Sequence, residues 1–153
     1  MNHFGTASDR IFQGRTLVAG SATGSILRLT EPLSFWGGME VATGRIIDQH
    51  HPQVGICLSG TILVMPAGRG SSSSSSVLAE AIYAGTAPAA IVLSESDVIV
   101  ALGAMVAKEL YGLSCPVVVI ENIAVAEGVS VAIEATTNGA VARLASSGNS
   151  HLV

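Results

Sequence analysis

Apolar and polar positions follow three successive patterns along the chain. From Gly14 to Leu29 apolar residues alternate with polar ones around Gly20 and Gly24, which predicts two strands joined by a short Ser/Thr/Gly turn. Residues 30–55 show no sustained periodicity and are rich in glycine, proline and polar side chains, which predicts a long irregular loop. Loops of this length are usually functional or disordered, and the aromatic pair in its FWGG stretch argues against disorder.

After the loop, strand-like and helix-like patterns alternate. The stretches ICLSGTILVMPAG, APAAIVLSE and CPVVVIE predict strands, whereas SSSVLAEAIYAG predicts a helix that ends at Gly85. A second helix is expected to begin at Ser96 or Asp97, either of which can cap it, and to end at Gly112. This β-α-β-α-β order over about residues 56–121 implies parallel strands with right-handed crossovers. The unbroken apolar runs AAIVL and PVVVI suit strands that are covered on both faces.

The C-terminal part returns to alternation. GVSVAIEATTNGAVARLASS predicts two short strands with Asn138-Gly139 as the hairpin turn. The sequence therefore predicts one α/β domain over residues 1–153, with a core at about 14–145 and flexible termini. Its centre is parallel β-α-β-α-β, and antiparallel strands stand at both ends.

Composition excludes several classes of protein. Hydrophobic residues make up 49% of the chain and charged residues 12%, and the net charge is −4, so no basic surface is expected to bind nucleic acid. The longest apolar region is interrupted by SESD, and neither half has the about 20 residues that span a bilayer. Because the N-terminus lacks the pattern of a signal peptide, a cytoplasmic protein with no membrane contact is expected.

The low charge also bears on partners. A surface with few charges exposes apolar area, which favours a permanent partner; a compact domain with a Ser/Thr/Gly surface is the alternative. Cys57 and Cys115 are isolated, without CxxC or Cys/His spacing, so neither a disulfide framework nor a zinc site is expected. Both are expected to be small buried hydrophobes.

Six consecutive serines, Ser71 to Ser76, stand at the junction between a predicted strand and a predicted helix. The first helical turn carries unpaired N–H groups and a partial positive charge, and Gly68 and Gly70 allow a close approach of backbone to ligand. The junction can thus bind a carboxylate or phosphate. The P-loop, dinucleotide and GxSxG motifs are all absent, so a polar helix cap without chemistry is the alternative.

Two further groups lie in the long loop. Asp48, His50 and His51 in DQHHP form a polar cluster in which His51 is a candidate acid, base or ligand, with an ordinary polar turn as the alternative. Trp36, beside two glycines, either lines a pocket, anchors a partner or packs in the core.

Several stretches together resemble a known family. PLSFWGGMEVATGRIIDQHHPQVG, LSGTILVMPAGRGSSSSS, APAAIVL, GAMVAKELYG and CPVVVI are similar to the small subunit of aconitase X, the equivalent of the swivel domain of the aconitase superfamily. The resemblance covers about residues 14–135, and the joint presence of FWGG, TGxIIDxxHP and GRGSSS makes it specific. One departure is Met39-Glu40-Val41, where the family is expected to have Asp-Pro.

The resemblance implies a swivelling three-layer β/β/α domain and a set of site residues. In aconitase the matching Gly-Ser-Ser-Arg segment supplies the base that removes the substrate proton, and by position this base is Ser71. Ser72 is then a neighbouring substrate contact, and Ser73 replaces the arginine, which implies a substrate other than a tricarboxylate. The remaining residues expected to bind substrate are Gly70, Arg69, His51 and Asp48.

The same resemblance implies a hydro-lyase that needs a partner. The iron-sulfur cluster or iron ion is expected in the large subunit, so this chain is expected to bind no metal and to be inactive alone. Two substrates are known in the family. Dehydration of cis-3-hydroxy-L-proline to Δ1-pyrroline-2-carboxylate is favoured over dehydration of mevalonate 5-phosphate, because only Arg69 and Arg45 are available for a phosphate. The composition, poor in lysine, also differs from that of hyperthermophiles. A non-catalytic module that binds a small anion or a protein is the remaining alternative.

Overall fold

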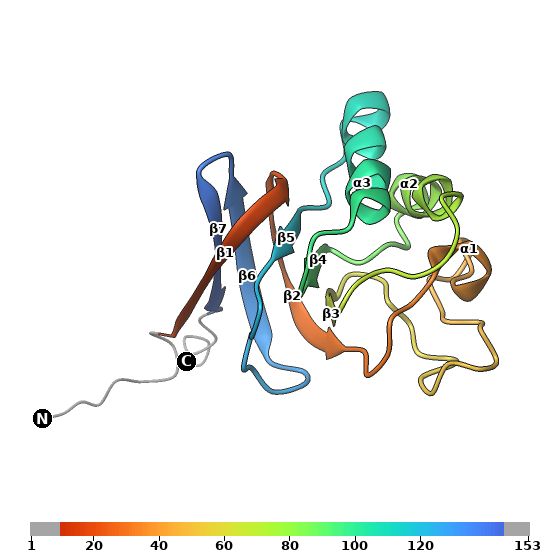
Figure 1. Cartoon of the computed structure of the whole chain (residues 1–153), viewed down its shortest axis with the longest axis horizontal. Coiled ribbons are helices and arrows are strands. Elements are labelled where there is room, and N and C mark those ends of the chain that lie inside the picture. Colours follow the sequence, from red (N-terminus) through yellow and green to blue (C-terminus); the bar gives the residue numbers. More distant parts are fainter. Residues whose placement is uncertain (1–9, 146–153) are drawn as a thin grey trace, which may run out of the picture.

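The computed structural model describes residues 10–145, which form seven strands and three helices (Figure 1). The expected flexibility of the termini concerns residues outside this range, although β1 already begins three residues before the expected core. In chain order the elements are β1 (Ile11–Val18), β2 (Gly20–Arg28), α1 (Phe35–Gly38), β3 (Ile62–Met65), α2 (Ser74–Ala84), β4 (Ala90–Leu93), α3 (Val98–Tyr111), β5 (Val117–Val119), β6 (Ser130–Thr136) and β7 (Gly139–Leu144).

The strands close into a barrel in the order β1-β5-β4-β3-β2-β6-β7. Neighbours from β2 through β3 and β4 to β5 are parallel, whereas β1, β6 and β7 pair antiparallel with their neighbours. The long strands β1 and β2 each pair on one edge with the parallel part and on the other edge with the hairpin β6–β7. The predicted parallel centre between antiparallel ends is confirmed.

Side chains of the parallel strands alternate between two cores. Leu63 and Ile91 belong to a cluster shared with α2 and α3, whereas Ile62 and Val92 belong to a second cluster shared with β6 and β7. This is the period of two that a strand requires, and it explains why these strands are apolar throughout. Both helices cover the same side of the strands (Figure 1), so the architecture has the three layers β/β/α that the resemblance implies.

The two long helices begin and end as predicted. The caps Gly85 (φ 80°) and Gly112 (φ 67°) end α2 and α3 in the left-handed conformation, which glycine adopts without steric cost. The side chain of Asp97 caps α3 by accepting hydrogen bonds from the N–H groups of Ile99 and Val100. These local signals therefore set both ends of α3 and the end of α2.

Two boundaries differ from the prediction. The strand expected from Ile56 begins only at Ile62, because the preceding residues turn at Gly60 (φ 72°) and Cys57 bridges to Arg45 of the long loop instead. Gly24 lies inside β2, and the connection between β1 and β2 is shorter than expected. The long loop is confirmed as irregular apart from the single turn α1. No helix within residues 10–145 has the length and apolar character needed to cross a membrane.

Candidate active site

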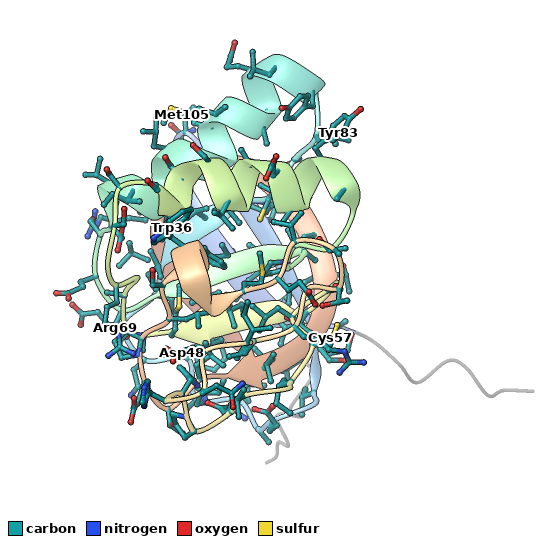
Figure 2. The ribbon with its side chains drawn as sticks, turned by 90° about the vertical axis from the view of Figure 1, so that its right-hand side faces the viewer. Trp36, Asp48, Cys57, Arg69, Tyr83 and Met105 are labelled. Atoms are coloured by element: carbon teal, nitrogen blue, oxygen red, sulfur yellow. The ribbon has the colours of Figure 1, made fainter. Side chains whose placement is uncertain are left out.

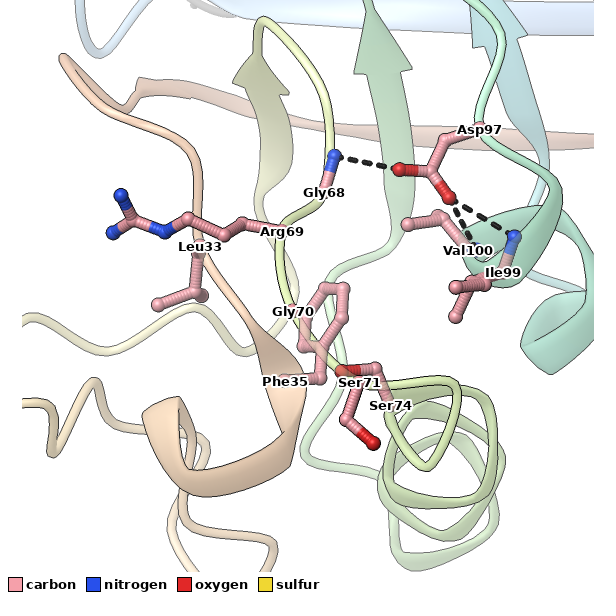
Figure 3. Close-up of a pocket in the computed structure, with 10 residues that line it drawn as sticks. All are labelled: Leu33, Phe35, Gly68, Arg69, Gly70, Ser71, Ser74, Asp97, Ile99 and Val100. Carbon is pink, nitrogen blue, oxygen red and sulfur yellow. Dashed lines mark hydrogen bonds between the residues drawn. The ribbon is translucent and has the colours of Figure 1, made fainter.

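A hollow lies where the loop after β3, the segment around α1 and the start of α3 meet (Figure 3). Its cavity volume is about 70 Å³, and it is open to solvent. Such a volume is well below the roughly 300 Å³ at which small-molecule sites begin, so a ligand here would be covered only in part by this chain. The lining residues are Leu33, Phe35, Gly68, Arg69, Gly70, Ser71, Ser74, Asp97, Ile99 and Val100.

The loop after β3 is held on both sides before it reaches the serines. The backbone N–H of Arg69 donates to the carbonyl oxygen of Leu33 at 3.3 Å, and that of Gly68 donates to Asp97 Oδ2 at 2.9 Å. Gly70 then turns the chain with φ 96°, and a Cβ there would lie 2.6 Å from Ser34 Oγ. The two glycines of GRG are thus required by close contacts and by backbone conformation, and together they place the next residue at the start of α2.

Ser71 lies at that point and is half-buried. Its Oγ accepts a hydrogen bond from the N–H of Ser73 at 3.0 Å, and its carbonyl oxygen accepts one from Ser74 at 2.9 Å. Within residues 10–145, no acceptor is found for the N–H groups of Gly70, Ser71 and Ser72. Unpaired donors and the partial positive charge of the helix start favour negative charge at the Ser71 oxygen or on a ligand beside it.

Ser74, also in the hollow, was not singled out by the sequence. It is 4% exposed, and its Oγ accepts from the N–H of Trp36 at 3.0 Å and lies 3.2 Å from Ser34 Oγ. This hydroxyl therefore ties the FWGG segment to the serine helix. A signal for it existed, because Ser74 precedes the buried Leu78 by one helical turn and so lies on the buried face of α2.

The other serines predicted to bind substrate are more exposed. Neither Ser72 nor Ser73 lines the hollow, and both are exposed to solvent. Ser73 instead borders a neighbouring depression together with Trp36. Contact of either side chain with a substrate would occur only with a ligand that extends out of the hollow.

Arg69 is the cationic side chain among the lining residues. It is exposed, and Figure 3 shows its guanidinium group extending to the side opposite Ser71. The long side chain can rotate, so Arg69 can meet an anion at the mouth of the hollow. Arg45, the second arginine considered for a phosphate, donates to the carbonyl oxygen of Gly55 and does not line the hollow.

The polar cluster of the long loop is not part of the hollow. His51 is 2% exposed; its Nδ1 accepts from the N–H of Gln53 at 3.0 Å, which leaves Nε2 to donate to the carbonyl oxygen of Glu31 at 3.2 Å. Both ring nitrogens are used in this structure, where His51 stabilises the loop, and its role in binding substrate stays a prediction. Asp48 accepts from the N–H of His50 at 2.9 Å, as in an ordinary polar turn.

Three other side chains settle questions that the sequence left open. Trp36 is 58% exposed, which excludes core packing of its indole. Cys115 is buried as predicted, and burial raises the pKa of its thiol to about 12. Cys57 is only partly buried, which corrects the prediction, and hydrogen bonding from Ser59, with the positive charge of Arg45, lowers the pKa of its thiol.

No group of three or more His, Cys, Asp or Glu side chains that could hold a metal ion occurs within residues 10–145. The two cysteines lie in different surroundings: Cys57 is at the bridge to Arg45 of the long loop, and Cys115 is in the core. The described residues therefore do not fit an iron centre, and no chemical step is assigned to one here.

The barrel, with two helices on one side and a glycine-serine turn at its edge, has the architecture of a swivel-type β/β/α domain. Residues 11–142 match the family model described as the aconitase X swivel domain, and the chain belongs to this family. The resemblance seen in the sequence is confirmed.

Relatives with assigned names are dehydratases. The chain is 55% identical over 103 residues to a cis-3-hydroxy-L-proline dehydratase of Pseudomonas aeruginosa, a match that covers 67% of this chain and 18% of the relative. It is 43% identical over 93 residues to a phosphomevalonate dehydratase small subunit of Methanothermobacter thermautotrophicus, which covers 61% of this chain and 71% of the relative. The chain thus spans less than one fifth of the length of the bacterial relative.

The fold is that of solved members of the family. The crystal structure of Thermococcus kodakaraensis aconitase X in its holo-form matches with a TM-score of 0.79 and 29% identity, covering 90% of this chain and 99% of that one. A second relative, solved by NMR in solution, matches with a TM-score of 0.75 and 30% identity over 90% of this chain.

Proposed function

We propose that this chain is the small subunit of a two-subunit hydro-lyase in which Ser71 is the catalytic base, and that the substrate is cis-3-hydroxy-L-proline. The observation that carries the proposal is the position of Ser71. In a domain of the aconitase X swivel family, its Oγ stands at the start of α2, accepts the N–H of Ser73 and borders a hollow.

In the proposed reaction Ser71 Oγ, as the alkoxide, removes the proton from the carbon that bears the carboxylate. The hydroxyl group leaves from the neighbouring ring carbon, takes up a proton from solvent and becomes water, while Ser71 later returns the proton it removed to solvent. The resulting enamine tautomerises to Δ1-pyrroline-2-carboxylate. A serine hydroxyl is a weak base unless its anion is stabilised; the N–H of Ser73 and the start of α2 supply part of this stabilisation. The unpaired N–H groups of Gly70 to Ser72, with Arg69 at the mouth, suit the substrate carboxylate.

The proposed partner is the aconitase X large subunit, which would hold the iron centre and close the site against water. Two observations support a partner on this side. The hollow is shallow, and large apolar side chains are exposed around the two helices above it; Figure 2 shows Trp36, Tyr83 and Met105 in this region. The M. thermautotrophicus relative is named a small subunit, whereas in the P. aeruginosa relative the matching part belongs to a longer chain.

The choice of substrate rests on charge and on similarity. A phosphate ester would favour several basic side chains at the site. Among the described residues, Arg69 is the one basic side chain that lines the hollow. The 55% identity to the cis-3-hydroxy-L-proline dehydratase also exceeds the 43% to the phosphomevalonate dehydratase small subunit. Mevalonate 5-phosphate dehydration is the second candidate because the chain is also similar to the phosphomevalonate dehydratase small subunit of M. thermautotrophicus. A non-catalytic swivel module that binds a small anion or a protein is the third.

The proposal is tested by producing the chain together with its large subunit under anaerobic conditions and offering both substrates to wild type and to Ser71→Ala. We expect turnover of cis-3-hydroxy-L-proline and a loss of about 10²- to 10⁴-fold in kcat for Ser71→Ala, the range for removal of a general base. Ser76→Ala is the matched control, because Ser76 lies in the same tract but is exposed and outside the hollow.

Each other outcome points to a different conclusion. Turnover of mevalonate 5-phosphate alone would replace the substrate and keep the base. Activity that survives in Ser71→Ala would move the base to another residue. A chain that forms no complex and turns over neither substrate would favour the binding module, and activity of the chain alone would contradict the need for a partner.

A further inference from the structure

We propose that Asp97 is a positioning residue for the catalytic serine: its carboxylate joins the loop that carries Ser71 to the first turn of α3. The inference rests on the proposed function, since it concerns the residue assigned there as the base. It goes beyond the helix cap that the sequence predicts for Asp97, because only one of its two oxygens serves the helix.

The two carboxylate oxygens have different partners. Oδ1 accepts from the N–H groups of Ile99 at 2.9 Å and Val100 at 3.0 Å, which is the helix cap. Oδ2 accepts from the N–H of Gly68 at 2.9 Å, across 29 residues of sequence (Figure 3). Asp97 therefore connects two segments that are separate in the chain and that both line the hollow.

The contact at Gly68 is close enough to require glycine. A Cβ at residue 68 would lie 2.8 Å from Asp97 Oδ2 and 2.9 Å from Val100 Cγ2. No ion pair of Asp97 with a basic side chain is found in the described part of the chain, so its carboxylate acts through backbone N–H groups. Three such bonds hold the carboxylate in one orientation, and a fixed acceptor in turn fixes Gly68.

A displacement at Gly68 reaches Ser71 because the residues between them have little freedom. Arg69 is bonded to Leu33, and Gly70 lies against Ser34, where even a Cβ would meet Oγ at 2.6 Å. The segment from Gly68 to Ser71 is short and held at both ends. Loss of the Asp97 bond therefore displaces Ser71, because no flexible loop lies between them to absorb the movement. Small displacements of a base from its productive position reduce the rate of the chemical step more than they reduce binding.

Two substitutions separate the loop contact from the helix cap. In Asp97→Asn one oxygen still caps α3, while the amide NH₂ faces the N–H of Gly68, so donor meets donor. In Asp97→Ser the hydroxyl also caps a helix well but is too short to reach Gly68 as well. Both variants should therefore keep α3 and lose the loop contact. Glu134→Gln is the control for the change of charge, because Glu134 lies exposed on β6 and outside the hollow.

The first measurement is steady-state kinetics of the complex with the large subunit. For both Asp97 variants we expect kcat to fall by about 10- to 100-fold while KM changes by less than about threefold, the pattern of a misplaced base. The melting temperature of the Asp97 variants should fall by no more than about 8 °C, because the N–H of Gly68 loses its acceptor, and the Glu134→Gln control should stay close to wild type. A kcat equal to wild type in both variants would overturn the inference. A fall in kcat that is fully explained by a smaller folded fraction of the variant at the assay temperature would also overturn it.

The second measurement needs no activity. Amide hydrogen exchange, followed by NMR on the full 153-residue chain, should become at least about tenfold faster at Gly68 and at Ser73, whose N–H reports the position of Ser71 Oγ. Exchange at Val100 should stay as in wild type, since the cap is kept. If wild type dehydrates neither substrate, the proposed function fails and this measurement alone decides whether Asp97 positions Ser71. Unchanged exchange at Gly68 and Ser73 in both variants would overturn the inference.

Discussion

Within the serine tract, neighbouring side chains have different surroundings. Ser74 is buried and bonded to the FWGG segment, Ser71 borders the hollow, and Ser76 is exposed. Within α2 the rotation of about 100° per residue turns Ser74 toward the core and Ser76 toward the solvent, whereas Ser71 is placed by the turn at Gly70 before the helix begins. A run of identical residues is therefore not a run of identical roles.

Ser74→Ala should destabilise the chain by about 1–3 kcal/mol, because the N–H of Trp36 loses its acceptor next to the core. The measurement is urea-induced unfolding followed by circular dichroism. Ser76→Ala, an exposed position in the same helix, should change the free energy of unfolding by less than about 0.5 kcal/mol. Equal effects of the two substitutions would contradict a structural role of the Ser74 hydroxyl.

The two cysteines should differ in reactivity. The pKa of Cys57 is lowered, chiefly by hydrogen bonding from Ser59, whereas burial raises the pKa of Cys115 to about 12. Since the thiolate is the reactive form, iodoacetamide should modify Cys57 in the folded chain and leave Cys115 unmodified near neutral pH. The rate at Cys57 should rise with pH and reach half its maximum below the pH of an unperturbed thiol.

Mass spectrometry after short labelling checks this expectation, with chain unfolded in guanidinium as the control in which both cysteines react. Modification of Cys115 as fast as Cys57 in the folded chain would contradict the buried position of Cys115.

At the scale of elements, α2 and α3 pack closely at one glycine. A Cβ on Gly103 of α3 would lie 2.8 Å from the carbonyl oxygen of Ser75 and 3.1 Å from Leu78 Cβ, both in α2. The close packing of α2, the helix that follows Ser71, thus requires that residue 103 of α3 has no side chain. Both helices also share one core cluster with the parallel strands.

Gly103→Ala tests which of two effects dominates. Helix propensity favours alanine over glycine by about 1 kcal/mol, whereas overpacking a helix contact costs about 1–3 kcal/mol. Because the nearest atom belongs to backbone and cannot rotate away, we expect net destabilisation, measured as a lower urea midpoint. Val98→Ala also raises helix propensity, but at a side chain 79% exposed, so it should leave the midpoint unchanged or raise it. A stabilising Gly103→Ala would show that the helices can separate without cost.

At the scale of the whole molecule, the closed barrel holds the hairpin β6–β7 against the parallel strands and leaves the helices on the other side. Figure 2 shows Asp48 and Cys57 on the long loop below the helices, and Trp36, Tyr83 and Met105 near the helices themselves. Exposed apolar side chains are found near the helices, and also on the long loop and just after it, at Ile47, Val54 and Ile56. We expect the large subunit at the helices.

Much of this architecture follows from local patterns in the sequence. The helix ends at Gly85 and Gly112 and the cap at Asp97 depend on residues close in the chain and are found as predicted. The predicted hairpin is also present, but its two-residue turn is Thr137-Asn138, and Gly139 already belongs to β7. The motif GRGSSS likewise pointed to Gly70 and Ser71, and both residues line the hollow. Local conformational preference and a short motif suffice in these cases, because no distant residue is needed to produce them.

Other features depended on contacts between distant segments, which a single sequence does not display. The register of β1 and β2 between two halves of a barrel, the late start of β3, the burial of His51 and the bond from Asp97 to Gly68 all join residues far apart in the chain. A hydroxyl, imidazole or carboxylate has the same covalent structure whether it faces solvent, substrate or a backbone N–H. The sequence alone therefore determined which groups are present and how the chain turns locally, and the tertiary structure decided which of these groups are free to act, because that depends on which distant donors and acceptors they meet.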